Sequence, residues 1–144
     1  MTSEVFKNQG FKAWIWLIKA YFGLWWVQAR IKWSSISWLN SKVEFSSEPA
    51  YANKSTEPKM PFIMALHESV RLAARLHFIP ANCLPKSIVL VELLRGHGET
   101  ARVVVGIAKD RDRLASHAWV ELKSGPNWVI VGEAEAISEN FQKL

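Results

Sequence analysis

The chain has one cysteine, Cys83, and its surroundings suggest a reactive thiol. It lies in segment 82–87 (NCLPKS), directly before apolar residues with helical spacing. Pro85 suits the first turn of a helix, so the sulfur would lie near unpaired backbone N–H groups and the positive end of the helix dipole. This environment favours the thiolate, the nucleophilic form of cysteine. We predict that Cys83 is a catalytic nucleophile, the alternative being a small buried apolar residue.

A thiol nucleophile needs a base, and the chain offers four histidines. His67 and His77 fall in one helical pattern, and His97 stands between two glycines in a turn. His117 instead opens an expected strand after Cys83, at a sheet rim where its side chain could meet a helix start. We therefore predict that His117 removes the thiol proton and later returns it to the leaving amine.

A third residue should orient the imidazole and stabilise its charged form. The segments 117–122 and 128–131 are expected to form a hairpin. If this hairpin turns about Gly125, His117 pairs with Glu133, which becomes the predicted third catalytic residue. A slip of one residue would point Glu133 to the other face of the sheet.

Three other polar residues could take this role. Asp112 lies in a charged loop expected at 109–113 and is the reserve candidate. Asn127 would lie at the far end of the hairpin, roughly 16 Å away at 3.3 Å per residue. Glu121 shares a strand face with His117 but lies about 13 Å along it, so a substrate contact or a structural ion pair is expected there.

The elements that position these residues indicate an α+β fold. A helix at 84–95 should pack on a small antiparallel sheet made of a strand at 101–108 and the hairpin. Pro61 suits the start of another helix, at 62–78. The composition divides the chain into an aromatic, basic helical segment at 1–45, a linker at 46–60 and a catalytic domain at 61–144.

Six of the eight tryptophans lie between Trp14 and Trp38. The apolar residues from Phe11 to Ile36 keep helical spacing, and three cations fall on the other side: Lys12, Lys19 and Arg30. The apolar stretch is short and has a lysine near its middle, which argues against a membrane span. The helix is expected either to pack on the domain or a partner protein through its aromatic face, or to lie in a membrane interface.

The formal charge of +5 indicates a mildly basic surface. No zinc-ligand spacing, phosphate-binding loop or RNA-binding motif accompanies this charge, so an acidic peptide or a lipid surface is a better partner than nucleic acid. We expect no metal and no cofactor. A single cysteine forms no internal disulfide and fits a reducing, cytoplasmic setting.

Several segments together resemble the transglutaminase-like cysteine leader peptidases of lasso-peptide biosynthesis. They are 80–87 (PANCLPKS), 93–95 (LLR), Gly98, 105–107 (VGI) and 117–121 (HAWVE), and the resemblance spans roughly residues 62–133. It implies a transglutaminase/papain-like core and a bacterial, cytoplasmic cysteine protease. Such a protease removes the leader from a ribosomally synthesised precursor peptide, before a separate ATP-dependent cyclase closes the macrolactam.

The resemblance also implies a leader-recognition protein that presents the precursor, which in some members is fused ahead of the protease. The first sixty residues here show no run of strands that would build such a domain, which suggests the stand-alone form. The family's triad is Cys-His-Asp, and no aspartate follows His117, so Glu133 would take that place. Two alternatives stay open: another thiol acyl-transfer enzyme, such as a transglutaminase or amidase, and a non-catalytic adaptor.

Overall fold

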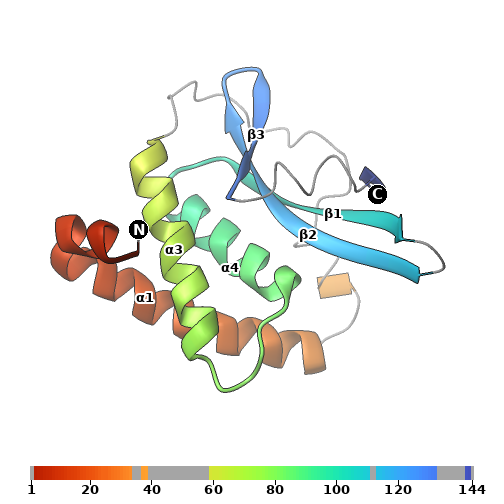
Figure 1. Cartoon of the computed structure of the whole chain (residues 1–144), viewed down its shortest axis with the longest axis horizontal. Helices are drawn as coiled ribbons and strands as arrows, with labels where there is room; N and C mark the ends of the chain where they lie inside the picture. Colours follow the sequence, from red (N-terminus) through yellow and green to blue (C-terminus); the bar gives the residue numbers. More distant parts are fainter. Residues whose placement is uncertain (1, 34–36, 39–58, 111–112, 133–141, 144) are drawn as a thin grey trace.

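The structure is a computed structural model that describes residues 2–33, 37–38, 59–110, 113–132 and 142–143. Its elements in chain order are α1 (Thr2–Trp33), α3 (Met60–Leu76), α4 (Cys83–Gly96), β1 (Ala101–Asp110), β2 (Arg113–Ser124), β3 (Asn127–Val131) and β4 (Gln142–Lys143). The strands form one antiparallel sheet in the order β3-β2-β1-β4, and the helices gather on one side of it (Figure 1). The predicted α+β fold is confirmed.

Helix α4 lies between the sheet and the other helices. Its central residues are almost continuously apolar and buried, because β1 and β2 cover one side of the helix while α1 and α3 cover others. The strands contribute every second residue to this core, as period-2 alternation requires: Ala101 and Val103 of β1, and Ala118, Val120 and Leu122 of β2. Residues from all three helices join the same buried cluster, so the helix that carries Cys83 is held on several sides.

Strands β1 and β2 are longer than predicted. Their pairing runs as far as Asp110 with Arg113, inside the segment expected to be a charged loop. The prediction was wrong here because two residues suffice to close a hairpin, so a run of charges does not mark the full length of the connection. His117 consequently lies within β2, opposite Gly106, and does not open the strand.

The hairpin of β2 and β3 closes one residue later than predicted. Trp128 pairs with Lys123, and Val131 pairs with Val120. Gly125 has φ 58° and is followed by a proline, a combination that suits a two-residue type II′ loop. The predicted pairing of His117 with Glu133 assumed the other register. Glu133 itself lies outside the described residues, so this pairing stays a prediction.

Helix α1 packs on α3 and α4, through the face opposite to the predicted one. Its buried residues are Ala13, Trp16, Leu17, Ala20, Leu24 and Val27, whereas the aromatic stripe that begins at Phe11 and Trp14 is exposed. Both faces are apolar, so helical spacing alone does not identify the packed one. In the described part of the chain, no helix has the length and apolarity needed to cross a membrane.

The predicted linker falls almost entirely outside the described residues, and α3 begins at Met60. After β3, Gln142 and Lys143 form β4, which pairs with Ile107 and Gly106 of β1.

Candidate active site

Cys83 is the first residue of α4, as its sequence context predicts. Its side chain is partly exposed and forms no disulfide. The preceding residue, Asn82, makes no side-chain hydrogen bond to the helix start, and the first intrahelical bond runs from the Lys86 N–H to the Asn82 carbonyl at 3.4 Å. N–H groups of the first helical turn have no acceptor within the helix, so they can bind negative charge beside the thiol.

A hydrogen bond between α4 and β2 sets the place of Cys83 relative to His117. The Ser87 hydroxyl donates to the carbonyl of Ala118 at 3.2 Å, and both residues are buried. Cys83 lies one helical turn before Ser87, and His117 directly precedes Ala118. One contact therefore brings the start of the helix to the strand that carries the histidine.

Cys83 and His117 line the same cavity, of about 220 Å³. In the described part of the chain β3 pairs with β2 only from Val120 to Ser124, so the edge of β2 at His117 borders the cavity. Helix α3 supplies the opposite wall through His67, Val70 and Arg71; the other lining residues are Lys86, Ser87, Leu90, Ala118, Trp119, Val120 and Val131. The two predicted reactive residues are thus brought together by three different elements.

The surroundings of His117 favour the neutral form of its imidazole. Burial lowers the pKa of His117 below 6.5, and the positive charge of Lys86 lowers it further. A neutral imidazole can accept a proton, which is what a general base must do in the resting enzyme. The Trp119 ring stacks near the imidazole, with the ring centroids 6.5 Å apart.

We predict that Lys86→Gln raises the pKa of His117, because it removes one of the two causes that lower this value. The acidic limb of any His117-dependent activity should then move to higher pH. The measurement is an NMR titration of the His117 ring in a Cys83→Ala background, so that the thiol does not contribute. Lys12→Gln is the control, because it also removes one positive charge, at an exposed position on α1. An equal pKa in both variants would contradict the assigned cause.

The sequence interpretation missed His67 as part of this cavity. The ring of His67 lies against Gly132, which follows β3: a Cβ built on Gly132 would stand 2.7 Å from His67 Nε2. Gly132 also has φ 94°, which L-residues rarely adopt. The spacing of His67 and Arg71 places both on one helix face, but the sequence holds no signal for which face of α3 meets Cys83.

We predict that Gly132→Ala destabilises the protein by about 1–3 kcal/mol, because it combines backbone strain with a clash against the His67 ring. Gly98→Ala is the matched control: Gly98 has φ 85° but no atom within 4 Å of an added Cβ. Urea denaturation of both variants separates strain from contact. Equal losses of unfolding free energy would show that the contact with His67 contributes nothing.

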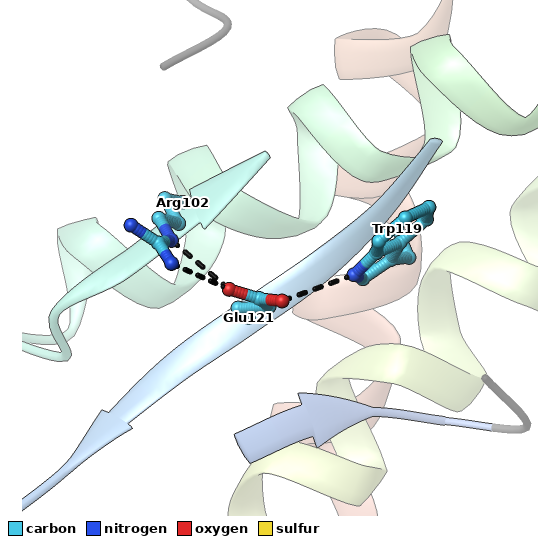
Figure 2. A network of polar contacts seen from close by, with 3 residues as sticks. All are labelled: Arg102, Trp119 and Glu121. Carbon is cyan, nitrogen blue, oxygen red and sulfur yellow. Dashed lines mark hydrogen bonds and ion pairs between the residues drawn. The ribbon is translucent and has the colours of Figure 1, made fainter. Parts of the chain in front are cut away.

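Glu121 takes no part in the cavity and forms a structural ion pair, one of its two expected roles. Its carboxylate accepts hydrogen bonds from Arg102 Nε at 3.0 Å, from Arg102 Nη2 at 2.8 Å and from Trp119 Nε1 at 3.3 Å (Figure 2). The Arg102 guanidinium also lies 4.0 Å from the centre of the Trp128 ring. The two acids predicted for the triad, Glu133 and Asp112, lie outside the described residues, so a third catalytic residue stays a prediction.

Comparison with known proteins agrees with this geometry. A search of the curated proteins and a search of the solved structures both returned no match. Among the described residues, no group of three His, Cys, Asp or Glu side chains could hold a metal ion. The family model for the transglutaminase-like superfamily matches residues 23–144, a range that includes α3, α4, all four strands, Cys83 and His117. Because this match covers most of the sequence, the chain belongs to the transglutaminase-like superfamily.

Proposed function

We propose that the protein is a cysteine peptidase that removes the leader from a lasso-peptide precursor. The observation that carries the proposal is the shared cavity of Cys83, at a helix start, and His117, whose lowered pKa suits a base. Membership of the transglutaminase-like superfamily supports thiol chemistry. Removal of a leader peptide, in particular, is supported by the sequence resemblance of segments 80–87 and 117–121 to the leader peptidases.

The proposed reaction cleaves one peptide bond in two acyl-transfer steps. His117 takes the thiol proton, and the Cys83 sulfur attacks the carbonyl carbon of the last leader residue. N–H groups at the start of α4 stabilise the resulting oxyanion, and the His117 imidazolium protonates the departing amine of the core peptide. Water, deprotonated by His117, then attacks the thioester, which releases the leader carboxylate and regenerates the thiol.

The proposal includes partners and a location. A separate leader-recognition protein presents the precursor, and an ATP-dependent cyclase then joins the released core amine to an acidic side chain. The enzyme works in the bacterial cytoplasm, where a free thiol such as Cys83 stays reduced. Glu133 orients the His117 imidazole in this proposal, with Asp112 as the reserve candidate.

The test uses a lasso-peptide precursor as substrate, with a leader-recognition protein added, and identifies products by mass spectrometry. We expect release of the intact leader as a free acid. His117→Ala should abolish cleavage, and Glu133→Ala should reduce it less. If Asp112→Ala is the more damaging acidic change, the assignment of Glu133 is wrong.

The same assay with a primary amine distinguishes hydrolysis from acyl transfer. A leader amide formed in preference to the acid would assign the protein to the transglutaminase or amidase class. An independent measurement follows alkylation of the single thiol by iodoacetamide against pH. A rate profile that is unchanged by His117→Ala would contradict a thiol paired with histidine and favour the adaptor role.

A further inference from the structure

A second cavity, of about 370 Å³, adjoins the one beside Cys83. It is lined by Arg71, Ala74, Arg75, Ala81 and Lys86, and two of these residues, Arg71 and Lys86, also line the cavity of Cys83 and His117. A continuous surface therefore leads from the thiol, between α3 and the start of α4, to a region where three of five lining residues are cations. We call the surface formed by Arg71, Arg75 and Lys86 the cationic groove.

The charge of the cationic groove comes chiefly from Arg75 and Lys86, because Glu68, on α3, pairs with Arg71 at 3.6 Å. Neither cavity has an acidic residue in its described lining. The field extends to the reactive residues, since the charge of Lys86 contributes to the lowered pKa of His117. An anionic group on a bound peptide would therefore meet net positive charge beside the thiol.

We propose that the cationic groove binds an acidic side chain of the substrate, close to the peptide bond that Cys83 cleaves. The Arg75 guanidinium can bind a carboxylate through two hydrogen bonds, and Lys86 adds a point charge near the thiol. The proposal rests on the proposed function and narrows its substrate class to peptides with Asp or Glu near the cleavage site.

The test compares two reagents that differ by one charge, N-bromoacetyl-glutamate amide and N-bromoacetyl-glutamine amide. Both reagents carry the same thiol-reactive bromoacetyl group, so the ratio of their alkylation rates at Cys83 reports the effect of the carboxylate. The measurement does not require peptide cleavage. Relative to a small free thiol, the wild type should favour the glutamate reagent. Arg75→Gln and Lys86→Gln should each lower the ratio about two- to fivefold, and added salt should lower it as well. Lys12→Gln, on α1, is the control and should leave the ratio unchanged.

A ratio equal to that of the small thiol in the wild type would overturn the cationic groove and leave the peptidase proposal intact. Failure of both reagents would instead argue against a reactive Cys83. In that case N-acetyl-glutamate amide tests the groove alone, through shifts of the Ala81 and Lys86 backbone amide signals in NMR spectra. Shifts that the glutamine analogue does not cause would support the groove, and their absence would overturn it.

A separate inference comes from the outer face of α1. Seven large apolar side chains there are between 52% and 80% exposed: Phe11, Trp14, Ile18, Phe22, Trp25, Trp26 and Trp33. Their spacing places them along one side of the helix, opposite the buried residues. In Figure 1, α1 lies at the outer edge of the molecule, with α3 and α4 on one side of it only. Contiguous apolar surface of this kind marks an interaction site.

The charges of α1 indicate what this face binds. Lys12, Lys19 and Arg30 lie along one flank of the exposed stripe, and residues 10–33 contain no acidic side chain. Tryptophan rings beside lysine and arginine are typical of helices that lie in the interface of an anionic membrane. Protein interfaces, by contrast, are depleted of lysine.

We infer that the outer face of α1 binds an anionic lipid surface, with the helix axis parallel to the membrane plane. The apolar rings would enter the boundary between headgroups and acyl chains, and the cationic flank would contact the headgroups. The opposite face of α1 stays packed on α3 and α4, so binding requires no unfolding of the core.

The test measures sedimentation of the protein with vesicles of phosphatidylcholine, with and without 30 mol% phosphatidylglycerol. We expect binding to the anionic vesicles, weakened by salt, with a blue shift of tryptophan fluorescence. The double variant Trp14→Gln/Trp25→Gln should bind at least about tenfold more weakly. Phe78→Gln/Ile79→Gln is the matched control, since it removes two exposed apolar side chains outside α1.

Two results would overturn the lipid assignment. One is an absence of sedimentation with anionic vesicles for wild-type protein that circular dichroism shows to be folded. The other is a dimer in light scattering that Trp14→Gln/Trp25→Gln dissociates, which would assign the face to a second copy of the chain. Equal losses of binding in the α1 variant and in the Phe78 and Ile79 control would also contradict a specific role for this helix.

Discussion

Replacement of Cys83 by alanine should reduce cleavage of the precursor peptide by at least about a thousandfold. Cys83 is the thiol expected to form the covalent acyl intermediate. The hydroxyl group that lines the described part of the cavity, on Ser87, cannot replace it, because Ser87 is buried and donates a hydrogen bond to the Ala118 carbonyl. The measurement is a single-turnover assay with the precursor and the recognition protein, followed by mass spectrometry.

The neighbouring variant Asn82→Ala provides the control. Asn82 is exposed and makes no capping hydrogen bond through its side chain, so its loss should leave both activity and stability close to those of the wild type. Cys83→Ala should itself stay folded, with an unchanged circular dichroism spectrum, because it removes only one partly exposed sulfur atom. Cleavage retained by folded Cys83→Ala would refute the nucleophile assignment and make Cys83 a packing residue.

Glu121→Ala should cost about 3–5 kcal/mol of the free energy of unfolding. Glu121 is 1% exposed, and its carboxylate accepts hydrogen bonds from Arg102 and from the Trp119 indole. The variant would leave the largely buried Arg102 charge without this partner, and an uncompensated buried charge is strongly unfavourable. Urea denaturation measures the loss.

A double variant separates the value of the pair from the cost of breaking it. Glu121→Leu/Arg102→Met replaces both charges by apolar groups, so it should be much more stable than Glu121→Ala. Trp119→Phe removes only one hydrogen bond to Glu121 and should cost about 1 kcal/mol. A loss below about 1 kcal/mol for Glu121→Ala would mean that water reaches the pair and screens its charges.

The elements around Cys83 could be predicted because their signals are local. Pro85 and the glycines after Arg95 mark the ends of α4, and the β-branched residues of 103–105 mark β1. The hairpin register could not be predicted, since it depends on the backbone conformation of Gly125 and Pro126. A shift of one residue at that turn changes which residue of β3 pairs with each residue of β2.

The walls of the candidate site were less predictable than Cys83 and His117. His67 and Arg71 reach the cavity through the way α3 docks on the sheet, and this docking depends on contacts between distant residues. The packed face of α1 was also hidden, because apolar residues occupy both sides of that helix. For α1 the sequence pattern predicts the helix but not the face through which it packs.

The two-residue strand β4 has a practical consequence for anyone who shortens or tags this chain. Lys143 pairs with Gly106, and Gly106 pairs on its other side with His117. A chain cut before Gln142 would therefore leave that part of β1 without its neighbour, one strand away from His117. Bare strand edges of this kind recruit other chains. Truncated protein should aggregate more readily, and a purification tag is better placed at the amino end.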